Sequence, residues 1–255
     1  MLSSNALTKQ TTTKDSTMKS LTTLATVLMT GVIFNAQGSE TNLVEPLRPS
    51  AKRAIGEFDQ IGAERKKDLQ QAASFIRGKL DQGKPANVTF ICTHNSRRSH
   101  LSQIWAQTAA AYYGITNVTT YSGGTEATAC NIRTVRALRR AGFSIAQSTG
   151  GTNPVYLAQY SESLPAAKMY SKKFASPENP QKDFAAIFSC DDAADKCPVV
   201  EGASLRLPIV YVDPKVWDNT PAETPTYDER SRQIAREMFY LMSSVRTAPL
   251  KTASR

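Results

Sequence analysis

The stretch VTFICTHNSRRS, residues 88–99, decides the fold of this chain of 255 residues. Its first five residues form an apolar run rich in strand formers, and a polar turn then leads into a helical pattern through Leu101, Ile104 and Trp105. A strand that leads directly into a helix begins a βαβ unit, and such units build parallel sheets. Open parallel sheets bind ligands beyond the carboxyl ends of their strands. The stretch therefore predicts an α/β fold with Cys92 at the ligand-binding edge.

Strand and helix patterns alternate along the rest of the chain. The expected strands are residues 118–122, 184–189 and 205–212, and the expected helices are residues 99–113, 132–141 and 231–245. Prolines and a Gly-Gly pair interrupt residues 146–183, where we expect a short extra hairpin. The pattern predicts an open parallel sheet of about four strands with helices on both faces.

The residues before this pattern divide into two parts. Residues 1–38 contain Lys19, a short apolar run and a pair of small residues, which is the layout of a secretory signal over 18–38; a disordered tail and a single anchor are the alternatives. The run is shorter than a span of about 20 residues, so we expect no stable membrane span in the mature chain. A true signal implies an exported or periplasmic protein, and otherwise the protein is cytoplasmic. Residues 39–86 are predicted to form a helical extension whose apolar stripe packs on the main domain, residues 87–250.

Composition narrows the class of protein. A hydrophobic share of 40% and a charged share of 21% exclude a disordered or fibrous chain. The net charge of +9 favours anionic ligands, but no concentrated basic tract, zinc-finger or helix-turn-helix signature is present, so we expect no nucleic-acid partner. The four cysteines, Cys92, Cys130, Cys190 and Cys197, are too few for a disulfide scaffold and need individual explanations.

The turn after Cys92 has the pattern C-x5-R-S, which suits a tetrahedral oxyanion. Backbone N–H groups of such a turn form an anion nest, the following helix adds partial positive charge, and Arg98 offers two parallel donors. The same field favours the thiolate form of Cys92, whose sulfur Ser99 can hydrogen-bond, while Asn95 tolerates a left-handed backbone. The alternative is a buried structural cysteine beside surface arginines. The expected oxyanion-binding loop comprises Thr93, His94, Asn95, Ser96, Arg97 and Ser99.

Three side chains near this loop have more than one interpretation. His94 is interpreted as a loop or rim residue, with a general base as the alternative. Arg97 is interpreted as a rim or surface charge, with a second oxyanion clamp as the alternative. Asp213 follows the expected strand 205–212 and so lies at the same edge as Cys92, where it can protonate a leaving oxygen. An Asp-Pro pair is also a common turn former, which is its other interpretation.

Three motifs together resemble the low-molecular-weight protein tyrosine phosphatase superfamily: residues 92–99, the segment YSGGTEA at residues 121–127 followed by Asn131, and Asp213-Pro214. The segment CDDAADKCP at residues 190–198 resembles the redox segment of the thioredoxin-coupled arsenate reductases, the branch to which the chain looks closest. The resemblance covers about residues 87–246. It implies a flavodoxin-like open sheet of the low-molecular-weight phosphatase fold, with 87–250 as the catalytic domain, and no metal or resident cofactor.

The resemblance implies that the chain reduces arsenate through a cysteine relay. Cys92 would attack arsenic while Arg98 and the loop hold the oxygens, and Asp213 would protonate the departing oxygen. Cys190 would then attack the sulfur of Cys92, release arsenite and leave a disulfide. Cys197, joined to Cys190 by a flexible Asp/Ala-rich loop, would carry the disulfide outward to a dithiol reductant such as thioredoxin.

Several alternatives stay open. Cys190 and Cys197 form either this relay, a static disulfide or two free thiols, and Cys130 is expected to be a packed thiol. A phosphatase that hydrolyses phosphate monoesters through a phosphocysteine needs only the nucleophile, the arginine and the acid, and a module that binds oxyanions without turnover needs less. The loop also departs from the family, because Arg97 stands where a second cysteine is common and His94 where glycine is usual.

Overall fold

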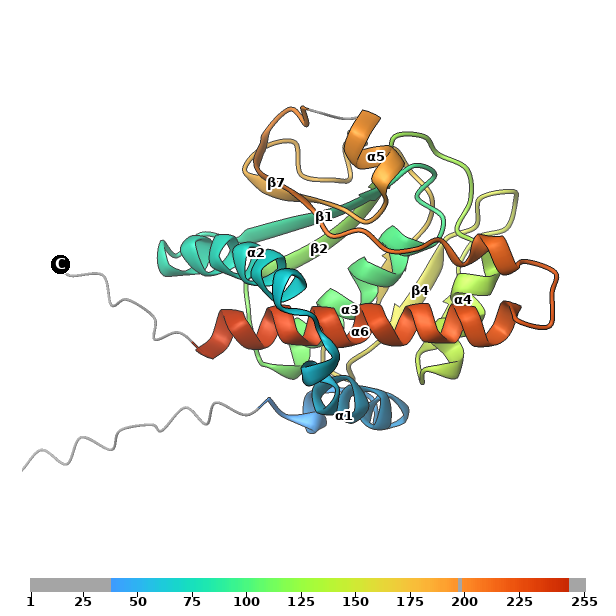
Figure 1. Cartoon of the computed structure of the whole chain (residues 1–255), viewed down its shortest axis with the longest axis horizontal. Helices are drawn as coiled ribbons and strands as arrows, with labels where there is room; N and C mark the ends of the chain where they lie inside the picture. The colour runs from blue at the N-terminus through green and yellow to red at the C-terminus, as the bar shows by residue number, and fades with distance from the viewer. Residues whose placement is uncertain (1–37, 197–198, 248–255) are drawn as a thin grey trace, which may run out of the picture. The chain divides into compact units, whose positions relative to one another are not determined.

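The computed structural model describes residues 38–196 and 199–247, all within one compact unit, residues 35–255 (Figure 1). The expected signal, apart from its last residue, and Cys197 lie outside the described residues. The helices are η1 Glu40–Asn42, η2 Glu45–Leu47, α1 Arg48–Gly56, η3 Phe58–Gln60, α2 Ala63–Asp81, α3 Arg98–Tyr112, α4 Ile132–Arg140, α5 Asp191–Lys196, η4 Pro214–Trp217 and α6 Glu223–Thr247. The strands are β1 Ala86–Cys92, β2 Val118–Gly124, β3 Ser144–Gln147, β4 Tyr156–Gln159, β5 Ala167–Met169, β6 Phe184–Phe188 and β7 Ala203–Pro208. In the part of the chain so described, no helix is long and apolar enough to cross a membrane.

Four parallel strands form the central sheet in the order β2-β1-β6-β7. β1 pairs with β2, with Cys92 opposite Gly124, and on its other side with β6, with Ile91 opposite Phe188. The chain thus leaves β1 in one direction and later continues on its other side, which puts a topological switch point between β1 and β6. The prediction of an open parallel sheet of about four strands is confirmed.

Helices cover both faces of the sheet, but unequally. The face formed by Val88, Phe90 and Ile187 belongs to the main hydrophobic core, together with residues of α2, α3 and α6. The face formed by Ile91 and Phe188 is covered by the short helix α5 and the segments around it. Figure 1 shows α5 on one side of the sheet and α3 and α6 on the other.

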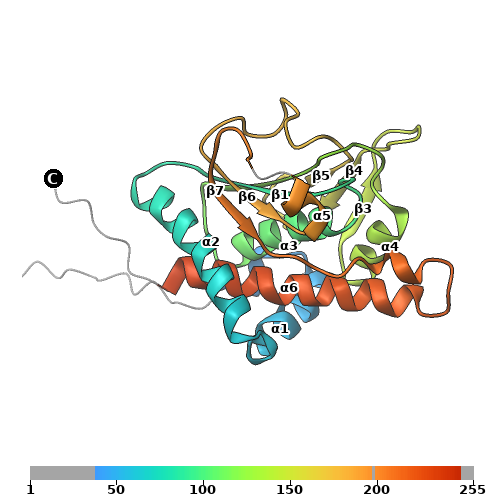
Figure 2. The ribbon, with the colours of Figure 1, turned by 45° about the horizontal axis from the view of Figure 1, so that its top comes forward.

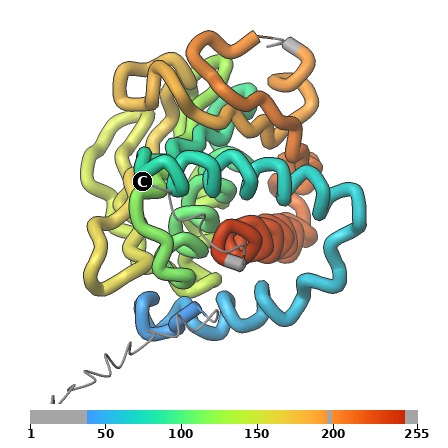
Figure 3. Tube along the Cα trace, turned by 90° about the vertical axis from the view of Figure 1, so that its left-hand side faces the viewer, coloured from blue at the N-terminus to red at the C-terminus, as the bar shows by residue number. Residues whose placement is uncertain are grey.

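The predicted helical extension is present and shares this core. α1 and α2 both pack on α6, and α2 also reaches β1 and β7. Figure 3 looks along α6 and shows α1 and α2 on two sides of it. Leu47, Leu69 and Ile76 are fully buried in the same cluster as the sheet residues. The apolar stripe of the extension therefore packs as expected from its spacing.

Three expectations for the later elements need correction. β7 begins at Ala203 and ends at Pro208 rather than at residue 212, and it alternates in burial because it is an edge strand. Beyond Pro208 the Ile209 and Tyr211 N–H groups still donate to Phe188 and Ser189, but the segment is no longer a regular strand. α6 begins at Glu223, eight residues before the expected start. Residues 144–169 contain not one hairpin but a three-stranded antiparallel sheet in the order β3-β4-β5, which lies beside the central sheet in Figure 2.

Candidate functional site

Cys92 is the last residue of β1, and its buried Sγ lies 3.0 Å from the Ser99 Oγ at the start of α3. The Asn95 amide donates to the same hydroxyl oxygen over 2.9 Å. The backbone of Asn95 has a φ of 44°, in the left-handed region that a tight turn requires. Its side-chain oxygen accepts the Lys172 N–H at 2.9 Å. These contacts fix the loop in one conformation around the sulfur.

Gly124 lets the end of β2 approach the loop. A Cβ atom at this position would lie 2.2 Å from the Glu126 carbonyl oxygen and 2.6 Å from that of Thr93. The Glu126 N–H donates to the Thr93 carbonyl (2.8 Å), and the Thr125 N–H donates to the Cys92 carbonyl (3.1 Å). Any side chain at residue 124 would displace these bonds, which explains the glycine in the segment YSGGTEA.

The loop leaves its backbone N–H groups free while most of its carbonyl groups are bound. Within the described residues, the N–H groups of residues 93–97 donate to no protein acceptor. In contrast, the His94 carbonyl accepts from the Ser171 hydroxyl (2.8 Å), and the Ser96 carbonyl accepts from the Asn131 N–H (3.0 Å). Free N–H groups in succession before a helix N-terminus are the donors that bind an oxyanion. The arrangement can therefore hold three or more oxygens of a tetrahedral anion beside the Cys92 sulfur.

Arg98 and Asp213 meet at this loop. The Arg98 Nη2 lies 2.9 Å from Asp213 Oδ2, and Nη1 donates to the Tyr211 carbonyl over 2.9 Å. The other oxygen of Asp213 accepts the Lys215 N–H at 3.0 Å and caps η4. Asp213 is thus a turn former that also lies at the loop; its role as an acid stays a prediction. An oxyanion that takes both Arg98 donors must replace these two partners.

The segment before Asp213 is held by residues that no sequence motif indicates. The Ile209 and Tyr211 N–H groups donate to carbonyls at the end of β6. Arg65 of α2 donates to the Val210 carbonyl over 2.7 Å, and its guanidinium lies 5.5 Å from the Tyr211 ring centre. The Tyr211 hydroxyl donates to Glu237 of α6 over 2.9 Å, and burial raises the pKa of this carboxyl group. Asp213 is therefore positioned partly by the helical extension.

Arg97 lies at the rim, in a network with the segment after Asp213. Its Nε donates to the Tyr227 hydroxyl at 2.8 Å, and its Nη2 lies 3.5 Å from Asp218. Tyr227 is fully buried and donates to Asp218 over 2.8 Å. Arg97 Nε is also 4.0 Å from the outer oxygen of Asp213. The network joins the nucleophile loop to residues 213–218 and to the start of α6; the unusual arginine at position 97 was its only sign in the sequence.

Cys190 lies two residues after β6, next to the loop. It is buried in the same small hydrophobic cluster as Cys92, and its sulfur lies 3.6 Å from the Thr93 hydroxyl. The prediction of a flexible loop after Cys190 is wrong, because residues 191–196 form the helix α5. The first turn of α5 carries two aspartates, which stabilise a helix N-terminus. Cys197 follows α5 and lies outside the described residues.

The remaining candidate residues have simpler surroundings. His94 is half exposed at the rim, with Nε2 3.5 Å from a carboxylate oxygen of Glu126. Cys130 is buried, and burial raises its pKa to about 12, so it is a packed, protonated thiol. Across the described part of the chain, no group of three or more His, Cys, Asp or Glu side chains is arranged to hold a metal ion.

Comparison with known proteins agrees with this geometry. The family model described as low molecular weight phosphotyrosine protein phosphatase matches residues 87–159, which include the Cys92 loop and the Gly124 approach. This part of the chain belongs to the low-molecular-weight protein tyrosine phosphatase superfamily. An arsenate reductase from Bacillus licheniformis is 28% identical over 145 residues, which cover 57% of this chain and 86% of that protein.

Solved structures with a likeness to this superfamily member are more distant. An arginine phosphatase from Geobacillus stearothermophilus has 13% identity and a TM-score of 0.41, over 62% of this chain and 91% of its own. A thioredoxin-dependent arsenate reductase from Corynebacterium glutamicum has 15% identity and a TM-score of 0.32, over 74% and 92%. The classification rests on the family match over residues 87–159 and on the strand order of the central sheet. The chain is an enzyme of this superfamily, either an arsenate reductase or a phosphatase.

Proposed function

We propose that this enzyme reduces arsenate to arsenite, the chemistry of arsenic detoxification. The observation that carries the proposal is Cys190, a second buried thiol at the switch point of the sheet, 3.6 Å from the loop residue Thr93 and in one cluster with Cys92. Hydrolysis of a phosphate ester needs one thiol, whereas reduction of arsenic(V) needs two, because each sulfur supplies one electron. The similarity to the arsenate reductase of Bacillus licheniformis supports the same choice.

The first step forms a bond between sulfur and arsenic. The Cys92 thiolate attacks the arsenic of arsenate while Arg98 and the loop N–H groups bind the oxygens that do not depart. One oxygen leaves as water, and Asp213, which lies at the loop and loses its contact with Arg98 when the oxyanion binds, supplies a proton for it. Arsenic stays in the +5 state at this stage.

The second step transfers two electrons to arsenic. The Cys190 thiolate attacks the Cys92 sulfur, the bond between sulfur and arsenic breaks, and its electron pair stays on arsenic. Arsenic leaves as arsenite in the +3 state, and the two sulfurs are left as a disulfide. Cys197 then attacks Cys190, frees Cys92 and forms a Cys190–Cys197 disulfide. An external dithiol such as thioredoxin reduces that disulfide by the same exchange, so no resident metal or cofactor takes part.

A phosphatase is the second candidate, and one surface feature favours it. Val212, Val216 and Trp217 flank Asp213 and are 67%, 70% and 47% exposed. This apolar rim suits the ring of a bulky phosphate monoester. In that case Cys92 forms a phosphocysteine, which water hydrolyses.

A serine scan of the cysteines separates the two activities. We expect Cys190→Ser to reduce arsenate turnover with thioredoxin to background while leaving hydrolysis of p-nitrophenyl phosphate unchanged. Cys92→Ser should abolish both reactions, and Cys130→Ser, the matched control at a buried thiol outside the relay, should retain both. Full arsenate turnover by Cys190→Ser would overturn the relay. Hydrolysis without any arsenate reduction by the unmodified enzyme would establish the phosphatase instead.

A further inference from the structure

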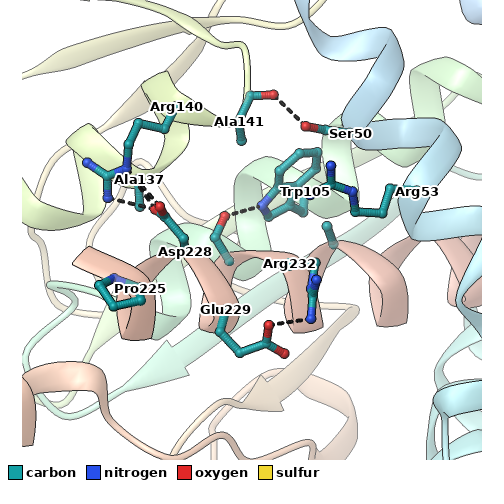
Figure 4. A pocket seen from close by; sticks show the side chains of 12 residues that line it. Ser50, Arg53, Trp105, Ala137, Arg140, Ala141, Pro225, Asp228, Glu229 and Arg232 are labelled. Carbon is teal, nitrogen blue, oxygen red and sulfur yellow. Dashed lines mark hydrogen bonds and ion pairs between the residues drawn. The ribbon is translucent and has the colours of Figure 1, made fainter. Parts of the chain in front are cut away.

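A cavity of about 390 Å³ lies between α1, α4 and α6, away from Cys92 (Figure 4). Its walls come from the helical extension and from the phosphatase-superfamily domain together, and the proposed relay uses none of them. Trp105 of α3 also lines it, seven residues after Arg98 and so about 10 Å further along the helix. Its volume falls within the range of small-molecule sites, roughly 300–1,000 Å³.

Most polar groups of the cavity already have partners within the protein. The Trp105 N–H donates to the Ser231 hydroxyl at 2.9 Å, and the Ser50 hydroxyl donates to the Ala141 carbonyl at 2.7 Å. The rest of the wall includes Ala137, Pro225 and Ala235. Trp105, Ala137 and Ala235 are almost fully buried, so the accessible wall is mixed: apolar surface at Ala141 and Pro225 stands beside polar groups that are mostly paired already.

The wall of the cavity carries three arginines but only two carboxylates, so one cation has no counter-ion there. Arg140 binds Asp228 through two nitrogens, at 2.9 and 2.6 Å, and Arg232 binds Glu229 at 2.6 Å. Arg53 lines the same cavity and forms no hydrogen bond or ion pair with any described residue. Figure 4 shows its guanidinium beside the Trp105 indole, opposite the Arg140–Asp228 pair.

We propose that this cavity binds a small carboxylic acid with an apolar, ring-sized body. The carboxylate pairs with the fork of Arg53, which matches two oxygens in one plane, and the ring lies against Ala141 and Pro225, beside the buried Trp105. One uncompensated guanidinium matches a single negative charge. A dianion such as a phosphate ester would bring its second charge toward Asp228 and Glu229, which repel it.

The binding test uses Trp105 as its reporter. The chain has two tryptophans, so in Trp217→Phe all tryptophan emission comes from Trp105. We expect 3-phenylpropionate to change this emission saturably, and the neutral 3-phenylpropionamide to bind at least about tenfold more weakly because it lacks the charge-assisted pair. Arg53→Ala in the same background should abolish that preference, and Arg53→Lys should restore part of it. Lys52→Ala is the matched control, an exposed cation of α1 outside the cavity, and should bind like its parent.

A second arm separates this site from the oxyanion loop. Saturating inorganic phosphate occupies Arg98 and the loop N–H groups, and we expect it to leave the titration unchanged. Loss of the signal in phosphate would place the ligand at the loop and overturn the proposal. Equal binding of the acid and the amide, no saturable change, or unaltered binding by Arg53→Ala would overturn it as well.

Discussion

His100 lies two residues after Arg98, fully buried on α3. Its Nε2 is 3.2 Å from the Tyr170 carbonyl oxygen, which can only accept, so Nε2 carries the proton. Nδ1 then has no partner among the described residues. Burial, with the nearby charge of Lys172, lowers the pKa of His100 to about 3. The imidazole is therefore neutral behind the oxyanion loop.

This burial predicts a loss of stability in acid. Unfolded histidine titrates near 6.5, so between that pH and about 3 the unfolded chain binds a proton that the folded chain does not. The unfolding free energy then falls by up to about 1.4 kcal/mol per pH unit. Between pH 7 and 4.5, we expect the free energy of unfolding of His100→Gln to fall by about 2–3 kcal/mol less than that of the unmodified chain, measured by urea unfolding. His94→Gln, at the exposed histidine, is the control and should keep the original slope; equal slopes in all three proteins would contradict the prediction.

At the scale of elements, the segment from β7 to α6 is the part that the site depends on most. It leaves the sheet at Pro208, carries Asp213 and reaches α6 at Glu223. It is anchored at both ends, by Arg65 on Val210 and by the network of Arg97, Asp218 and Tyr227. The position of Asp213 is therefore set by Arg65 of the helical extension as well as by the arginines at the nucleophile loop.

Tyr227→Phe tests one of these anchors. The substitution removes the hydrogen bonds to Arg97 and Asp218 while keeping the buried ring, and we expect it to slow turnover about tenfold, the loss of one or two bonds to charged groups. If Tyr227 acts by positioning Asp213, the rate of hydrolysis should fall more for phenyl phosphate than for 2,4-dinitrophenyl phosphate. Phenoxide is the poorer leaving group and needs the proton, whereas dinitrophenoxide leaves without it.

The two substrates also give the control. Tyr240→Phe removes another hydroxyl of α6, which accepts a hydrogen bond from Gln70 of α2 and not from a loop residue. It should leave the rates of hydrolysis of both phosphate esters unchanged. Equal losses for the two phosphate esters in Tyr227→Phe would show that the tyrosine acts on the whole structure and not through the acid.

The elements that could be predicted are those whose signal is local. The strand through Cys92, its turn and α3 follow from apolar spacing and turn chemistry over 25 residues or so. The end of β7 could not be found, because its place at the sheet edge is a property of the pairing, and α5 is too short to show a period. Arg65 and Val210 are 145 residues apart, so nothing near either residue reveals the contact. The residues of the loop could thus be predicted from local sequence, but the distant residues that hold the neighbouring segment in place could not.

At the scale of the whole molecule, the helical extension is part of the core. Leu43, Leu47, Leu69 and Ile76 are all 0% exposed and belong to the cluster that also contains Phe90 of β1. Full burial of such a side chain contributes about 1.5–3 kcal/mol, so the four contribute about 6–12 kcal/mol. That sum is comparable with the entire stability of an ordinary domain, about 5–15 kcal/mol.

We therefore expect a chain that starts at residue 87 to lose its cooperative unfolding transition, measured by calorimetry and by binding of an anilinonaphthalene sulfonate dye. Arg65→Ala in the full chain provides the contrast: it removes the contacts with Val210 and Glu237 but none of the buried leucines. Because Arg65 is a quarter exposed, its loss should lower the melting temperature by only a few degrees while slowing turnover. A truncated chain with the melting temperature of the full chain would show that the extension is dispensable for folding. An unaltered turnover in Arg65→Ala would show that it does not position the acid, so each result addresses one of the two roles.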